Sequence, residues 1–335
     1  MTQSKQKAVK YIILFFLLII GCFLAICIGS VAIPLSDVFS AFFNHDALSI
    51  NQLIIRSVRI PRVIGAIFAG IGLSTAGVLL QIVMNNSLAA PNVIGINSGA
   101  GLFVLCILVF FPNNYYVIPF AAFFGALIAA LLVYLIAHKT HISKVTVVLA
   151  GVAVSSLLNA IMNAIILFFP NASIDISSFM YGTLSGLTYS LILLPISLIG
   201  MISLLLFFLR NTWNILQLGD SLASSLGLRV NVIRFLLILC SAMLAGSVVS
   251  YAGLLGFVGL IVPHIARQII GNDAKQLIPF SAILGALIVV LSDLIGRIIF
   301  VPYEIPVGII MSFLGSPYFI YLLIRQKGGK SHADV

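Results

Sequence analysis

The run VIGAIFAGIGLSTAGVLLQIVM, residues 63–84, decides the class of this protein. It holds no charged residue, and as a helix it is long enough to cross a hydrocarbon core of about 30 Å. Comparable apolar runs recur along the chain. They lie at residues 11–29, 63–84, 93–111, 117–137, 145–169, 190–209, 231–250, 252–270, 278–300 and 305–324. We therefore predict about ten transmembrane helices.

The composition agrees with this prediction. Of the 335 residues, 61% are hydrophobic and only 7% are charged, and the mean hydropathy is +1.23, which is far from the composition of soluble domains. The runs are too long, and too uniformly apolar, for the strands of a membrane barrel. We predict an all-α integral membrane protein with one transmembrane domain, residues 1–335. The first run continues to Ile28 without a small-residue cleavage site, so we expect a retained span and not a signal peptide.

Lysine and arginine indicate the orientation, because they accumulate in cytoplasmic loops. Both tails, 1–10 and 325–335, are basic, so both ends are predicted to be cytoplasmic and the number of spans to be even. This topology places thirteen of the 17 basic residues inside the cell. The four on the outer side are Arg56, Arg59, Arg62 and Arg297. Three of them occur within seven residues, either as interfacial anchors of the second span or, as we favour, as a docking site on the outer face.

Small residues predict where helices approach closely. Ala66, Gly70 and Ser74 fall at intervals of four, and Gly253, Gly256 and Gly259 recur every third residue. We expect both sets to pack against neighbouring helices.

Asp293 is an acidic residue inside an apolar run, which makes it a functional candidate. Arg297 lies one helical turn further on, so we favour an internal ion pair over proton carriage. The alternative is a proton-coupled secondary transporter that uses Asp293 with Glu304. An intramembrane enzyme centred on His264 is a weaker alternative, because neither a base nor a nucleophile accompanies that histidine. We predict no catalytic residue and no metal site.

The segment NTWNILQLGDSLASSLGL, residues 211–228, is too polar to span a membrane. We predict a short cytoplasmic helix with Asp220 as its N-cap, Leu222 and Leu226 on one face, and Gly227 at its end. An exposed leucine face suits docking into a groove of a partner. The chain contains no phosphate-binding loop of the type GxxxxGK[ST], so energy from ATP would need a separate protein.

Several blocks, in order, together resemble the FecCD-type permeases of ATP-binding-cassette importers. These blocks are VRIPR from 58, GVLLQIVMNNSLAAPNVIGINSGAG from 77, LAGVAVSSL from 149, LGDSLASSLGL from 218, GLLGFVGLIVPHIARQIIGND from 253, SDLIGR from 292 and EIPVGIIMSFLGSPYF from 304. The resemblance covers residues 50–325. One departure is Ser87, where the family often has proline, and a looser turn after the second span would follow.

The resemblance implies a cobalamin-importer-permease-like (type II importer) fold in a bacterial cell membrane. It also implies a second permease subunit, identical or paralogous, two cytoplasmic ATPases that bind ATP and magnesium, and an external substrate-binding protein. The chain itself would contact lipid, would bind neither nucleic acid nor a cofactor, and would not be an enzyme. The cargo would be an iron chelate, with ferric siderophore favoured over haem and cobalamin.

The resemblance also implies roles for individual residues. Arg59, Arg62 and Arg297 correspond to arginines that contact the binding protein, and Arg56 lies just outside the matched block. The block within the coupling helices at about 212–228 implicates five residues in contact with the ATPase, namely Gly219, Asp220, Leu222, Ala223 and Leu226. Independently, the polar residues Ser155, Asn159 and Asn163 recur at roughly helical spacing in the fifth span, and we predict that they line the translocation path. Polar residues packed into the core of a dimer would produce the same pattern.

Overall fold

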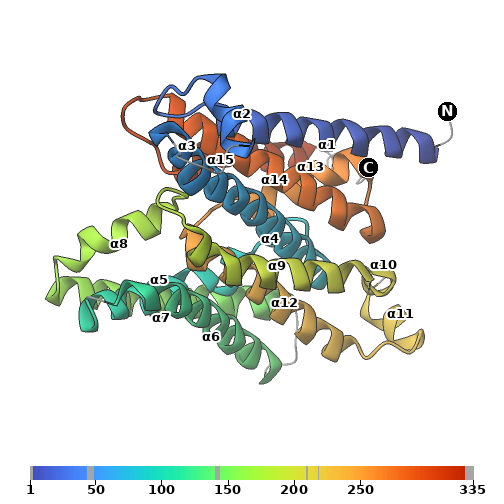
Figure 1. Cartoon of the computed structure of the whole chain (residues 1–335). Helices are drawn as coiled ribbons and strands as arrows, with labels where there is room; N and C mark the ends of the chain where they lie inside the picture. Colours follow the sequence, from blue (N-terminus) through green and yellow to red (C-terminus); the bar gives the residue numbers. More distant parts are fainter. Residues whose placement is uncertain are drawn as a thin grey trace.

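The computed structural model describes residues 3–43, 49–112, 114–139, 144–208, 210–217 and 219–328, which form helices and connecting loops (Figure 1). The helical segments, in order, are α1 (Gln3–Cys27), α2 (Leu35–Phe43), α3 (Ile50–Ile54), η1 (Ile55–Arg59), α4 (Ile60–Met84), η2 (Pro91–Ile94), α5 (Ile96–Phe110), η3 (Tyr115–Val117), α6 (Ile118–Lys139), α7 (Lys144–Phe168), α8 (Ala172–Tyr181), α9 (Tyr189–Phe208), α10 (Arg210–Gln217), α11 (Asp220–Ser225), α12 (Val230–Ala252), α13 (Val258–Ile270), α14 (Ala274–Ile298) and α15 (Val307–Gly328).

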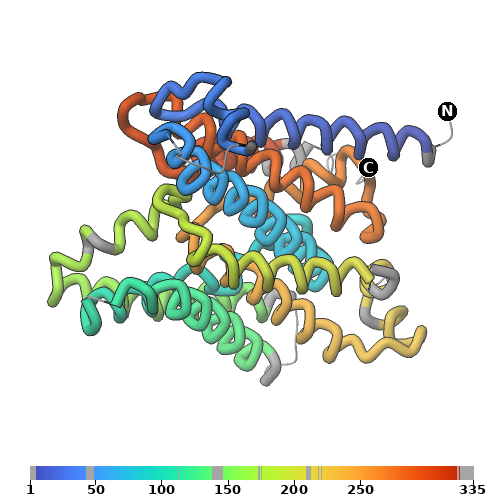
Figure 2. Tube along the Cα trace, viewed as in Figure 1, coloured from blue at the N-terminus to red at the C-terminus, as the bar shows by residue number. Residues whose placement is uncertain are grey.

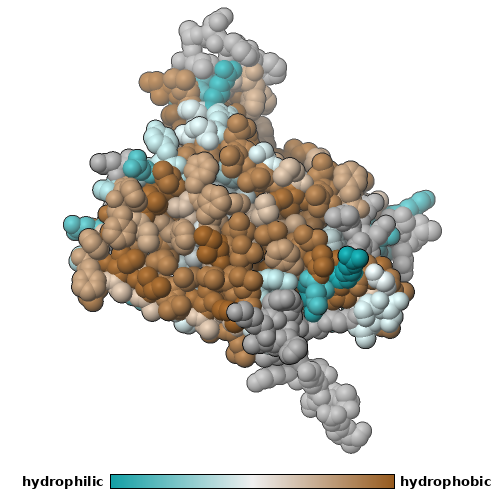
Figure 3. Space-filling model, turned by 90° about the horizontal axis from the view of Figure 1, so that it is seen from below, coloured by the Kyte–Doolittle hydropathy of each residue, from teal (hydrophilic) through white to brown (hydrophobic). Residues whose placement is uncertain are grey.

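The all-α fold is confirmed, and each of the ten predicted runs corresponds to an apolar helix. Among the described residues, seven helices are long and apolar enough to cross a membrane, and three shorter apolar helices, α5, α13 and most of α15, accompany them. Viewed from below, the molecule is hydrophobic across its middle, and hydrophilic residues lie toward the edges (Figure 3). A belt of this kind faces hydrocarbon in a membrane protein.

Helix α4 lies at the centre of the molecule and packs against α9, α12, α13 and α14. Helix α1 lies along α14, so the first and last parts of the chain are neighbours, blue beside orange-red in Figure 2. Helices α5, α6 and α7 form a second group, which α12 joins to α4. Most of α4 is buried on all sides, which explains why its sequence is apolar around its whole circumference.

Predicted small-residue contacts are present at Gly70 and Gly259. A Cβ on Gly70 would collide with the backbone of Gly285, and a Cβ on Gly77 would collide with the backbone of Gly259. Helices that approach this closely gain dispersion contacts along their backbones, which is the main attraction available within lipid.

The eighth span differs from its prediction at residues 252–270. Residues 253–257 are not helical, and α13 begins only at Val258. Gly253 and Phe257 both have positive φ, 68° and 63°, so the chain turns sharply before α13 starts. Gly253 and Gly256 therefore lie in a connector and do not share a helix face with Gly259. The 13 residues of α13 are about 20 Å long as a helix, shorter than a hydrocarbon core.

Main-chain hydrogen bonds tie residues 179–183 both to the region of the connector before α13 and to the start of α15. Thr183 N–H donates to the carbonyl of Ala252 at 2.9 Å, and Leu254 N–H donates to that of Phe179 at 3.0 Å. Gly308 N–H, in the first turn of α15, donates to Gly182 at 3.1 Å. Helix α15 thus starts at the end of the molecule where α8 stops, and it runs back toward the end where α1 starts and where α10 and α11 lie (Figure 1).

Candidate functional site

Arg59 closes the end of α1. Its Nη1 donates to the carbonyls of Ile26 and Cys27, each at 2.7 Å, and its Nη2 donates to Val31. These carbonyls lie where α1 ends, so they lack partners within that helix. The arginine is buried and acts as a cap for a helix more than thirty positions earlier in the chain.

Arg62, in the first turn of α4, forms the centre of a buried ion cluster. Its Nη2 lies 2.9 Å from Oδ1 of Asp293, and its Nε donates to both carboxylate oxygens at 3.0 Å. Its Nη1 donates to Oε2 of Glu304 at 2.7 Å. The other oxygen of Glu304 accepts from the Ser30 hydroxyl at 3.2 Å. One arginine therefore joins α4 to α14, to the loop before α15 and to the segment after α1.

Arg297 completes the cluster from the last turn of α14. Its Nε lies 3.2 Å from Oδ2 of Asp293, at an angle too poor for a hydrogen bond, so the contact is purely electrostatic. Its Nη1 donates to the carbonyl of Ala25 at 3.0 Å. The predicted internal pairing of Asp293 with Arg297 is confirmed. The two carboxylates and the two guanidinium groups balance in charge, as burial requires.

The structure places Arg59, Arg62 and Arg297 near one another, with their guanidinium groups turned inward. All three are buried and bound to partners within the chain. Arg56 is half-buried, and its Nε donates to the carbonyl of Ala41 at 2.6 Å. The docking role of these four arginines stays a prediction.

The segment after α9 forms two short helices, α10 and α11, where one was predicted. Gly219, with φ of 102°, is the N-cap of α11, so the prediction that Asp220 would be the N-cap is wrong, and Asp220 is instead the first helical residue. Gly227, with φ of 85°, follows the C-cap Leu226 as predicted. Leu222 and Leu226 are 56% and 62% exposed, whereas Ala223 is fully buried.

Helix α10 is attached firmly to the start of α14. Asn214 Nδ2 donates to Oδ1 of Asp273 at 2.7 Å, and Asn214 Oδ1 accepts from the N–H of Ala274 at 2.8 Å. Asp273 is the N-cap of α14. The hydrogen bond from Asn214, together with that from the N–H of Lys275, lowers the pKa of Asp273. Trp213 is buried and donates to the carbonyl of Leu206, which fixes α10 to α9 as well.

The predicted path residues lie on α7, a helix that is largely exposed in the single chain. Asn159 and Asn163 are exposed, whereas Ser155 is half-buried, and its hydroxyl lies 3.3 Å from where a Cβ of Gly95 would be. Exposed amides are costly in lipid, so this face of α7 needs water or another protein chain beside it. The assignment of the path stays a prediction.

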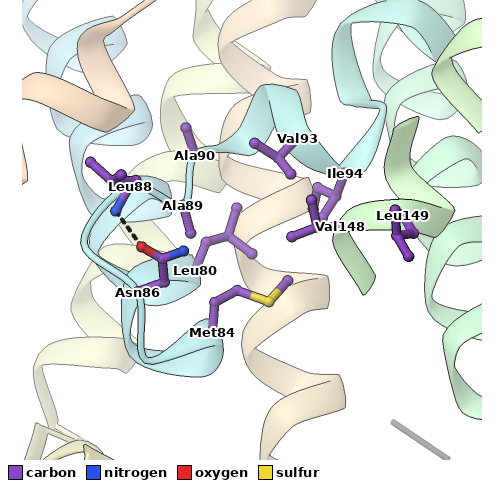
Figure 4. Close-up of a pocket in the computed structure, with 10 residues that line it drawn as sticks. All are labelled: Leu80, Met84, Asn86, Leu88, Ala89, Ala90, Val93, Ile94, Val148 and Leu149. Atoms are coloured by element: carbon purple, nitrogen blue, oxygen red, sulfur yellow. Dashed lines mark hydrogen bonds between the residues drawn. The ribbon is translucent and has the colours of Figure 1, made fainter. Parts of the chain in front are cut away.

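A cavity of about 300 Å³ lies between the end of α4, the loop that follows and the start of α7 (Figure 4). It is lined mainly by aliphatic side chains such as Leu80, Met84 and Val148. Within the loop, Asn86 Oδ1 accepts from the N–H of Leu88 at 2.9 Å, as the dashed line in Figure 4 shows. This side-chain turn holds the loop at the point where Ser87 replaces the usual proline.

His264, the centre of the weaker enzyme alternative, lies beside an aromatic side chain. His264 lies edge-on to Tyr318, with ring centroids 6.3 Å apart, and its Nδ1 is buried without a hydrogen bond. Of the five histidines, three fall outside the described residues: His45, His141 and His332. Among the residues that the structure describes, no group of three or more His, Cys, Asp or Glu could hold a metal ion.

Sequence reasoning missed Asn214, Ser30 and the exact partners of Glu304. Asn214 carried little signal, because it is one of many polar residues in the segment 211–228. Ser30 carried none, since its contact with Glu304 joins residues 274 positions apart.

Comparison with known proteins places the chain in a family. The model of the FecCD transport family matches residues 17–325, and the chain belongs to that family. The Fe(3+)-citrate import system permease protein YfmE of Bacillus subtilis (strain 168) is 38% identical, over 96% of each chain. The iron(3+)-hydroxamate import system permease protein FhuG of the same organism is 34% identical, over 97% of this chain and 99% of FhuG. A metal-chelate type ABC transporter, solved in an inward-facing conformation, is 26% identical, with a TM-score of 0.82 over 93% of this chain and 97% of that one.

Proposed function

We propose that this chain is the permease subunit of an ATP-binding-cassette importer that carries an iron chelate into the bacterial cytoplasm, with ferric siderophore as the favoured cargo. The observation that carries the proposal is the exposed leucine pair of α11. Leu222 and Leu226 project from a helix attached through α10 to α9 and α14, at the end of the molecule where α1 begins. An apolar pair on a firmly anchored element suits docking of a separate ATPase. Family membership and the two iron-chelate permeases named above support the cargo class.

The proposal includes a second permease subunit beside α7. The exposed amides of Asn159 and Asn163 would then face a shared aqueous path and not lipid. An external binding protein would deliver the chelate, and the chain would make or break no bond in it. Haem and cobalamin are the alternative cargoes.

Replacing both leucines tests the coupling role. We expect Leu222→Ser with Leu226→Ser to leave the permease folded, because both side chains are exposed, and to reduce chelate-dependent ATP hydrolysis by about tenfold or more, as expected when two apolar anchors are lost. The measurement is ATPase activity of the reconstituted complex with its binding protein and labelled iron chelate. Leu204→Ser, an exposed leucine within α9, is the matched control. Unchanged ATPase binding and stimulation in the double variant would contradict the proposal.

The proton-coupled alternative predicts a different pattern. In a proton-coupled transporter, uptake would stop when the proton gradient is collapsed, even with ATP present. For the proposed importer we expect uptake into ATP-loaded proteoliposomes to continue in the presence of a protonophore.

A further inference from the structure

A second cavity, of about 320 Å³, lies near the ends of three helices, away from α10 and α11. It opens between the first turns of α6 and α9, and the end of α12 forms its floor. Its lining is mostly aromatic and aliphatic, and it includes Phe120, Phe124, Leu194, Pro195, Ser247 and Tyr116. The lining contains no charged side chain.

Helix α9 carries a proline inside the helix where it borders the cavity. Pro195 has no N–H, so the carbonyl of Leu191 loses its helical donor at this point. Both residues line the cavity. Its lining is almost entirely apolar, so the groove favours an apolar occupant over water.

The groove lies among helices whose length and composition suit a membrane. Helices α6, α9 and α12 are each long and apolar enough to cross a membrane. Beside the opening, Phe124 on α6 and Leu193 on α9 are 51% and 73% exposed. Tyr116, which is 86% exposed, lies at the rim, where tyrosine is commonly found at the membrane–water boundary.

One polar feature distinguishes the floor. The hydroxyl of Ser247 is buried and has no hydrogen-bond partner, although a buried hydroxyl normally finds one. Ser250, also on the floor, donates to the carbonyl of Ser247 at 2.7 Å. The apolar body of the groove suits an acyl chain, and the unpaired hydroxyl can donate to an ester carbonyl oxygen at the head of that chain.

We propose that this groove binds one acyl chain of a bilayer phospholipid, lying between α6 and α9 over Ser247. A second copy of the chain is a poorer occupant, because the exposed amides that call for a protein neighbour lie on α7 and not on these helices. The absence of charge in the lining favours the acyl chain over the headgroup as the bound part.

Native mass spectrometry of the purified transporter complex tests the site. We expect the wild type to retain one phospholipid per permease, and Leu194→Trp, which fills the opening, to reduce that occupancy by about tenfold, the loss expected when two methylene groups no longer fit. The matched control is Leu205→Trp, a half-exposed leucine of α9 that does not line the groove. Equal lipid retention in the wild type and Leu194→Trp would overturn the proposal.

A phospholipid with a photoreactive acyl chain provides a second measurement on the unaltered protein. We expect its adducts to concentrate on α6 and α9 residues of the groove. Adducts spread evenly over the apolar surface would overturn the proposal, as would a disulfide between two copies carrying Leu194→Cys, which would make this face an interface between permeases.

Discussion

At the scale of single residues, the arginines of residues 56–62, RSVRIPR, show how a charged side chain can be buried in an apolar protein. Arg59 satisfies the carbonyls that end α1, and Arg62 binds Asp293 and Glu304. Each guanidinium group has several donors in a fixed plane, so it can satisfy several acceptors at once where lysine would not. The charge of Arg62 is compensated by two carboxylates, whereas Arg59 is held by main-chain carbonyl dipoles.

Removing the carboxylate of Asp293, which Arg62 and Arg297 share, tests how much the ion cluster contributes to stability. We expect Asp293→Asn to lower the free energy of unfolding by about 3–5 kcal/mol, because it leaves Arg62 and Arg297 buried with less compensation. Thermal unfolding of the purified permease in detergent measures the loss. Glu304→Gln is the control and should cost less, because the side chain of Glu304 is 26% exposed and that of Asp293 only 2%. A stable Asp293→Asn variant that fails only in proton-dependent uptake would instead favour proton carriage.

At the scale of helices, close backbone contact and terminal hydrogen bonds fix the packing. Gly77 meets Gly259 with no room for a Cβ, and Asn214 joins α10 to α14 through two hydrogen bonds. The first contact depends on the absence of a side chain and the second on a particular one. Both act between segments that are distant in the sequence.

The glycine contact can be tested by adding one methyl group. Gly77→Ala would force α4 and α13 apart, since the new Cβ would collide with the backbone, and we expect a loss of about 1–3 kcal/mol or more in stability. Gly200→Ala in α9 should be nearly neutral, because its Cβ would meet only Phe68 Cε1, at 4.0 Å. Fluorescence-detected size exclusion after a heating step compares the two. Equal melting temperatures would show that α4 and α13 separate at no cost.

The junction of α10 with α14 should depend on pH. Because the pKa of Asp273 is lowered in the folded protein, its contribution to stability is fully present above the unfolded value of about 3.9 and is lost as the pH falls through the folded value. We expect Asp273→Asn to destabilise the permease at pH 6 and to make a smaller difference toward pH 3. Melting curves across this range check the sign, and a difference that grows on acidification would contradict it.

At the scale of the whole molecule, the described chain begins and ends at one side, the side that carries α10 and α11 (Figure 1). An even number of apolar helices produces this arrangement. The opposite side carries the ion cluster, α8 and the start of α15. The two ends of the molecule therefore differ: one carries α10 and α11, and the other carries the ion cluster.

Cysteine labelling tests the predicted orientation. In a variant without Cys22, Cys27, Cys106 and Cys240, we expect Leu226→Cys to react with a membrane-impermeant maleimide only after cells are permeabilised. Tyr303→Cys, at a position 79% exposed beside the ion cluster, should react on intact cells. The reverse pattern would show that both ends lie outside.

The sequence by itself determined the class of protein, the ten apolar runs and the Asp293–Arg297 pair. Each of these depends on local properties, namely run length, hydropathy and the one-turn spacing of two charges. The interruption before α13 was not visible in the same way, because residues 253–257 are as apolar as the helix that follows them.

Only the tertiary structure decided what the arginines bind and where the cavities lie. Arg62 meets an acid 231 positions away and Asn214 meets one 59 positions away, and no periodicity encodes such distances. Hydropathy also cannot distinguish a helix face that packs on protein from one that faces lipid, because both are apolar. The physical reason is that the bilayer requires every span to be apolar. Which helices pack together therefore depends on shape, on close backbone approach and on a few buried charges.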